Sequence, residues 1–143
     1  MAVFNKFQDF TKQLARGKHA FDSHTFKVML TNELPLNTYT VASNIKEIAS
    51  GNGYVAGGKV TSVTLSDLAD GVSINGTEIV FAASGGSIGP FRYAVLYNES
   101  TVGGPLIGWW DYISSVILSD TETLTVKFNS ASQGSIFTLA CLG

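Results

Sequence analysis

The sequence GGSIGPFRYAVLYNESTVGGPLIGWWDY, residues 85–112, decides how this chain folds. It contains two apolar runs rich in aromatic and β-branched residues, 91–97 and 106–112, with a polar, glycine-containing spacer between them. Two such runs on either side of a turn are typical of a β-hairpin. We therefore expect this hairpin at the centre of the protein, with shorter and more polar strands around it.

The first run of the hairpin carries one conspicuous charge, Arg92. Both faces of 91–97 are otherwise largely apolar, which predicts an interior strand in which an unpaired charge would be strongly unfavourable. If Leu96 faces Ile107 across the hairpin, Arg92 faces Asp111. We predict that Arg92 and Asp111 form a buried, structural pair whose loss would be severely destabilising. The alternative is an arginine that reaches solvent and an aspartate in a turn.

Large aromatic residues most often fill the core of a β-sandwich, because each of them buries a large area. We assign Phe91, Tyr93 and Trp110 to the core, and the same register pairs Tyr93 with Trp110 on one face of the hairpin. Tyr39 and Tyr54 lie beside glycines or in turn-rich segments. We expect these two tyrosines at the surface, where they could contact a partner.

Near the N-terminus, Phe4, Phe7, Phe10 and Leu14 recur at spacings of three and four. This spacing predicts an amphipathic helix over about residues 3–17, with Gly17 as its stop. The apolar stripe could pack on the protein's own sheet or on a neighbouring subunit. The residues that we assign to an assembly surface are Phe4, Phe7, Phe10, Leu14, Tyr39 and Tyr54.

The rest of the chain reads as short strands separated by turn signals about every eight to twelve residues. This pattern predicts a single all-β domain over residues 1–143, an antiparallel β-sandwich or jelly roll of about eight strands with a short N-terminal α-helix. Asn75-Gly76 is a strong hairpin-turn dipeptide, and Gln133-Gly134 is a second expected turn. The other strands expected from the pattern are 24–31, 59–66, 72–75, 77–83, 115–119, 123–129 and 135–142.

The composition excludes several classes of partner. Hydrophobic residues make up 45% of the 143 residues and charged residues 14%, well below the usual charged fraction of about 25%. The net charge of −2 and the lack of a basic run argue against nucleic-acid binding. No apolar run approaches the ~20 residues of a membrane span. No signal-peptide pattern is seen, so we expect synthesis in a cytoplasm. The lone cysteine, Cys141, lies in an apolar alternating run and is expected to be buried.

The sequence offers no convincing catalytic or metal-binding constellation. His19, Asp22 and His24 are the nearest approach to a metal site, but a zinc site usually has three or four protein ligands with characteristic spacing. The glycine-rich run 85–89 is followed by Pro90 and a strand rather than by the helix that a phosphate-binding loop opens. We therefore expect a non-enzymatic protein with no metal and no cofactor.

Three stretches carry a resemblance to a known group of proteins: GNGYVAGG, GGSIGPFRYAVLYN and LIGWWDY. They resemble small virion structural proteins of tailed bacteriophages, and FRYAVLYN and IGWWDY are the most specific pieces. The likeness runs from the N-terminal helix through FKVMLTNELP to 123–129, which is most of the chain. The C-terminal SIFTLACLG departs from the pattern, so the resemblance covers the last strand least.

The resemblance implies a capsid decoration (cement) protein, which sits on the outer surface of the phage head and bridges major capsid proteins, often as a homotrimer. It implies no catalytic residues, and its partners would be further copies of itself and the major capsid protein, with neither nucleic acid nor membrane. The runner-up from a different class is a tail component or a carbohydrate-binding jelly-roll module. Many copies per particle would favour the first interpretation, and an exposed aromatic platform the second.

Overall fold

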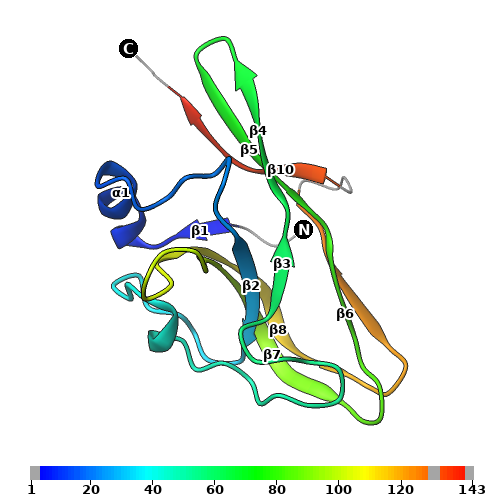
Figure 1. The fold of residues 1–143 in the computed structure, drawn as a ribbon. Coiled ribbons are helices and arrows are strands. Elements are labelled where there is room, and N and C mark those ends of the chain that lie inside the picture. The colour runs from blue at the N-terminus through cyan, green and yellow to red at the C-terminus, as the bar shows by residue number, and fades with distance from the viewer. Residues whose placement is uncertain (1–3, 129–132, 141–143) are drawn as a thin grey trace.

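The computed structural model describes residues 4–128 and 133–140 and shows an all-β protein with one short α-helix near its N-terminus (Figure 1). The helix, α1, covers Gln8–Ala15, and a single 3-10 turn, η1, covers Ala42–Asn44. The strands are β1 (Phe4–Lys6), β2 (Phe26–Thr31), β3 (Lys59–Thr61), β4 (Val63–Leu68), β5 (Gly71–Thr77), β6 (Ile79–Ala82), β7 (Ile88–Asn98), β8 (Leu106–Leu118), β9 (Thr123–Val126) and β10 (Gln133–Ala140).

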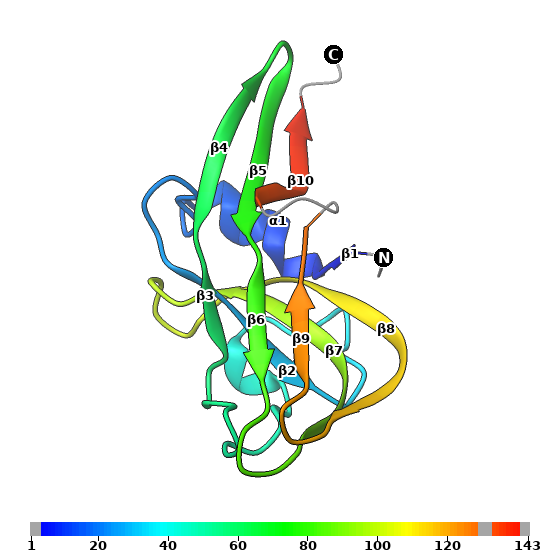
Figure 2. The ribbon, with the colours of Figure 1, turned by 90° about the vertical axis from the view of Figure 1, so that its right-hand side faces the viewer.

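The strands form two layers. One layer is a five-stranded sheet in the order β1-β8-β7-β2-β3. The other combines a three-stranded sheet, β10-β5-β4, with a two-stranded sheet, β6-β9, and Figure 2 shows these two sheets end to end. Within each of these sheets, every strand pair is antiparallel. The all-β fold with a short N-terminal helix, predicted from the turn spacing and the alternating strands, is therefore confirmed.

The main core lies between the two layers. Phe26, Phe91 and Leu96 enter it from the five-stranded sheet, and Phe81 and Phe128 from the opposite layer. A second apolar cluster covers the outer face of the five-stranded sheet, beneath the segment that contains η1. Its buried members are Phe7, Met29, Ile45, Tyr93, Val95, Tyr97, Leu106 and Trp109. The central hairpin, β7–β8, is consequently covered on both faces.

The register expected for the central hairpin is wrong by one residue. Tyr93 lies opposite Asp111, and Leu96 lies opposite Gly108 rather than Ile107. The ladder also shifts between Phe91 and Tyr93. A bulge changes which side chains share a face, and here it places Phe91 in the main core while Tyr93 lies in the second cluster.

Two expected turns are strand instead. Asn75 and Gly76 lie inside β5, paired with β4 on one side and β10 on the other. A Cβ atom at position 76 would lie 2.8 Å from Thr61 Oγ1 and 2.9 Å from Ile136 Cδ1. Gly76 is therefore required where the layers approach closely, and not for a turn. Gln133-Gly134 begins β10, and the expected strand 115–119 is the far half of β8.

The N-terminal helix is shorter than the expected range of about residues 3–17. Phe4 belongs to β1 and lies opposite Trp110, and the helix begins only at Gln8. Gly108 permits this arrangement, because a Cβ atom there would lie 2.5 Å from Asn5 O. The segment is thus part of the sandwich and not a detached arm. Cys141 lies outside the described residues.

Candidate binding surface

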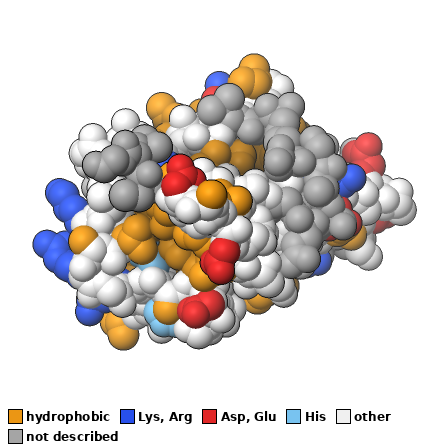
Figure 3. Space-filling model, turned by 90° about the horizontal axis from the view of Figure 1, so that it is seen from above, with side chains coloured by type: hydrophobic (Ala, Val, Ile, Leu, Met, Phe, Trp, Pro, Cys, Tyr) orange, Lys and Arg blue, Asp and Glu red, His pale blue; other side chains and the backbone are white. Residues whose placement is uncertain are grey.

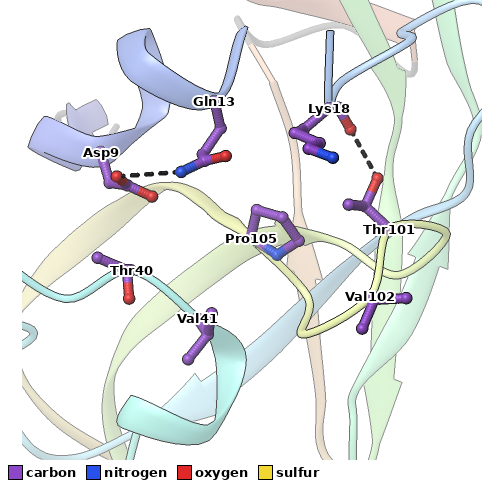
Figure 4. Close-up of a pocket in the computed structure, with 8 residues that line it drawn as sticks. All are labelled: Asp9, Gln13, Lys18, Thr40, Val41, Thr101, Val102 and Pro105. Carbon is purple, nitrogen blue, oxygen red and sulfur yellow. Dashed lines mark hydrogen bonds between the residues drawn. The ribbon is translucent and has the colours of Figure 1, made fainter. Parts of the chain in front are cut away.

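A hollow of about 380 Å³ opens between α1, the segment after it, and the loop that joins β7 to β8 (Figure 4). It combines an acid, a base, an amide and several apolar side chains. Its lining residues are Asp9, Gln13, Lys18, Thr40, Val41, Thr101, Val102 and Pro105.

Hydrogen bonds fix the β7–β8 loop on both sides of the hollow. On one side Thr101 Oγ1 donates to the carbonyl of Lys18 at 2.6 Å. On the other side Ala42 N donates to Gly104 O at 2.9 Å, and Leu106 N donates to Thr40 O at 3.0 Å. Because two separate segments hold the loop, the walls of the hollow are positioned before any partner arrives, which lowers the entropic cost of binding.

The hollow presents charged, amide and apolar groups side by side. Gln13 Nε2 donates to Asp9 Oδ1 at 3.3 Å, and Lys18 supplies a positive charge at the opposite wall (Figure 4). Val102 is 98% exposed at the rim. The hydroxyl of Thr101 donates to a main-chain carbonyl, whereas the hydroxyl of a nucleophile is activated by an adjacent base. The arrangement can accept a polar or small apolar side chain of a partner.

Two histidines support the loop from behind the hollow. Asn98 is fully buried at the end of β7, and its Nδ2 atom lies 3.2 Å from His19 Nδ1 and 3.0 Å from His24 Nδ1. His19 is itself buried and stacks on Phe21 with 5.8 Å between ring centroids. Burial, followed by the neighbouring His24, lowers the pKa of His19 to about 4. The Asn98 amide therefore links the ends of both imidazole rings to β7.

The described structure does not gather His19, Asp22 and His24 into a set of possible metal ligands. Among the residues that the structure describes, no three His, Cys, Asp or Glu side chains gather closely enough to hold an ion. Asp22, which lies between the histidines in sequence, is exposed. Nor does any described helix have the length and apolar character needed to cross a bilayer.

The apolar residues assigned to an assembly surface are largely used inside the chain. Phe7 is 1% exposed against Trp109, and Phe10 and Tyr54 are each 2% exposed in the main core. The expected exposure of Tyr54 is therefore wrong, and Phe7 and Phe10 follow the first alternative for the stripe, packing on the protein's own sheet. Phe4, Leu14 and Tyr39 are half-buried and pack against the same two clusters.

Tyr54 has a structural task that explains its burial. Its hydroxyl donates to the carboxylate of Glu47 and accepts from Leu30 N at 3.0 Å. Burial, together with this bond to Glu47, raises the pKa of Tyr54. The same carboxylate accepts from Gly57 N at 2.6 Å, so the glycine-rich loop is fastened to β2.

Arg92 and Asp111 meet, but at the surface rather than in the interior. The ion pair is bidentate: Arg92 Nε donates to Asp111 Oδ1 at 2.8 Å, and Arg92 Nη2 donates to Asp111 Oδ2 at 3.1 Å. The side chains are 37% and 27% exposed, so the expected burial is wrong. The bond to Arg92 lowers the pKa of Asp111. Asp111 also accepts from Ile113 N at 2.7 Å, which fixes the bend in β8.

Phe91, Tyr93 and Trp110 are 0%, 5% and 6% exposed, as the core assignment expects. Tyr93 and Trp110 nevertheless occupy different clusters, so the expected pairing of these two rings is wrong. The one-residue change in register places them on opposite faces of the sheet.

The sequence did not single out the β7–β8 loop as a surface feature, because its glycines and polar residues resemble those of any turn. Seen from above, hydrophobic side chains also gather in a depression with histidine at its margin (Figure 3).

Comparisons with protein-family models, with curated proteins and with solved structures gave no match.

Proposed function

We propose that this chain is a non-enzymatic structural protein of a tailed-phage virion, and specifically a decoration protein on the outer surface of the capsid. The resemblance of FRYAVLYN and IGWWDY supplies the phage context. The observation that carries the binding role is the preformed hollow beside the exposed Val102. A rigid β framework that presents such a rim suits attachment to a repetitive surface, where many modest contacts act together.

The carbohydrate-binding alternative finds less support. A sugar-binding face needs aromatic rings at the surface. All sixteen aromatic residues of the chain lie in the described ranges, and each is buried or half-buried. The tail-component alternative differs from decoration in copy number, which a quantitative gel of purified particles would measure. Many copies per head support decoration, whereas a few copies per particle contradict it.

Binding to isolated capsid shells tests the proposal directly. Purified protein should co-sediment with shells that lack it. Val102→Asp should weaken this binding about tenfold or more, because it places a charge where an apolar side chain meets the shell. Ile117→Asp changes an exposed residue of β8 outside the hollow and serves as the control. Loss of binding in both variants, or in neither, would contradict the assignment of this rim.

The homotrimer that the resemblance implies gains no support from the N-terminal stripe, because Phe7 and Phe10 are buried within the chain. Self-association therefore has to be argued from another surface.

A further inference from the structure

Strand β4 contributes little to the core of its own chain. Five of its six residues are exposed, and only Val63 is half-buried. Leu65 and Leu68 are 41% and 45% exposed. The hairpin of β4 and β5 projects beyond the rest of the molecule in both ribbon views (Figures 1 and 2), so a partner could approach β4 without obstruction.

The edge of β4 also lacks the features that usually prevent strand addition. Such features are short length, lysine, proline or a bulge. β4 pairs with β5 over six consecutive residues without a shift, and its one charge is Asp67. The other edges have features that disfavour strand addition: β1 and β3 have three residues each, β6 and β9 have four each, and β10 carries a register shift between Ser135 and Phe137.

The main-chain groups on this edge can be assigned. Thr77 N donates to Ser62 O at 3.1 Å, and Ser62 N donates to Thr77 Oγ1 at 2.9 Å, so Ser62 faces β5. Because hydrogen-bonded pairs alternate along an antiparallel ladder, Val63, Leu65 and Asp67 direct their N–H and C=O groups away from β5. No described residue forms a hydrogen bond to these outward groups.

We propose that β4 binds the β4 strand of a second copy of this chain, antiparallel about a twofold axis at Leu65. Residues whose N–H and C=O groups point away from β5 must lie opposite such residues of the second copy, because only then can hydrogen bonds form between the strands. This requirement leaves few registers. Centred on Leu65, the pairing places Leu65 opposite its own symmetry mate and Val63 opposite Asp67. Thr64 then lies opposite Ser66 of the other copy, so no like charges meet on that face. Centring on Asp67 would instead place two like charges opposite each other.

The occupant is a second copy because, in this register, the outward main-chain groups of the two strands match and Leu65 packs on its symmetry mate. A ring built by joining β4 to the β10 edge of the next copy is disfavoured by the bulge in β10. One six-residue edge buries less than the roughly 1,200 Å² of a standard interface, so the dimer should be weak in dilute solution. This inference does not depend on capsid binding.

Sedimentation velocity of the full chain, without capsids, tests the inference. From about 10 µM to about 1 mM, we expect the mass to rise from one chain toward two. Leu65→Lys should raise the dissociation constant at least about tenfold, because two ammonium groups would meet at the axis. Val80→Lys, at an exposed position of β6, should dimerise like the wild type.

Amide exchange of the wild-type protein gives a second measurement that does not depend on variant folding. The amides of Val63, Leu65 and Asp67 should exchange more slowly at high concentration than at low concentration. A mass that stays at one chain or reaches three, unchanged exchange at these amides, or equal effects of the two lysine variants would each overturn the inference.

Discussion

The ring of His19 ties the stability of the protein to pH. Its pKa falls from 6.5 to about 4 on folding, so the folded state favours the neutral ring. This contribution is complete above pH 6.5 and is lost as the pH falls toward 4. Allowing for residual solvation of the ring, we expect a loss of about 2 kcal/mol of unfolding free energy over this range, measured by urea unfolding at several pH values.

The matched control for this prediction is a second histidine. His19→Gln should remove most of the change in unfolding free energy between pH 6.5 and 4, whereas His24→Gln should leave most of it, since burial is the largest cause of the His19 shift. Asp111, whose pKa is lowered by Arg92, loses its contribution only at pH values below this window. Equal pH dependence in the wild type and the His19 variant would contradict the assignment.

Ile113 is a single residue whose backbone conformation opposes its side chain. It has φ of 77° within β8, a left-handed conformation that costs a β-branched residue roughly 1–2 kcal/mol. Its side chain is 75% exposed, so little burial would be lost on replacement. Ile113→Asn should raise the unfolding free energy by about 1 kcal/mol, because asparagine tolerates this conformation.

The control for the strain at Ile113 lies on the same strand. Ile117 is 57% exposed and its φ is not positive, so Ile117→Asn should bring no gain in the urea midpoint. A gain at both positions would point to reduced surface hydrophobicity instead of relieved strain.

At the scale of elements, alternation and turn spacing were sufficient to predict the fold class and the strands 24–31 and 123–129, apart from their ends. They failed where the layers come into contact. Gly76 has the sequence appearance of a turn glycine, but the side chains of Thr61, Phe128 and Ile136 require it. No local pattern marks that contact, because its partners are distant in sequence.

The prediction of the register of the central hairpin failed for a related reason. The shift between Phe91 and Tyr93 leaves no mark in a run of aromatic and β-branched residues. Arg92 and Asp111 still meet, because long side chains reach diagonal neighbours across a sheet. The hollow beside Val102 was not predictable, since it depends on how α1, the segment before η1 and the β7–β8 loop come together.

The N-terminal segment should be essential for folding. Phe10 contacts the rings of His19, Phe21 and Phe137, and β1 pairs with β8. Deletion of residues 1–17 should therefore abolish the cooperative thermal transition followed by circular dichroism. Phe10→Ala alone should cost about 3–5 kcal/mol.

A substitution that shortens one exposed side chain is the control for the Phe10 variant. Val80→Ala, at an exposed position of β6, should change the unfolding free energy by less than about 0.5 kcal/mol. A truncated protein that still unfolds cooperatively near the wild-type temperature would show that the segment is a separable arm.

At the scale of the whole molecule, the two proposed contact surfaces belong to different elements. The hollow is built by α1, the segment before η1 and the β7–β8 loop, whereas the self-association edge is β4. A copy could therefore hold the shell through one surface and a neighbour through the other. Each contact is modest alone, but contacts made together on a repeating surface strengthen each other.

The low charge of the molecule gives the last prediction, which concerns how the shell is held. The net charge is −2 and only 14% of residues are charged, while Asp9 and Lys18 place opposite signs in the hollow. Such a surface generates little long-range field for salt to screen. Binding to capsid shells should change less than about threefold between about 0.05 M and about 0.5 M sodium chloride, measured by co-sedimentation. A decrease of tenfold or more would mean that charge holds the protein on the shell, and Val102 would then be the wrong residue on which to centre the contact.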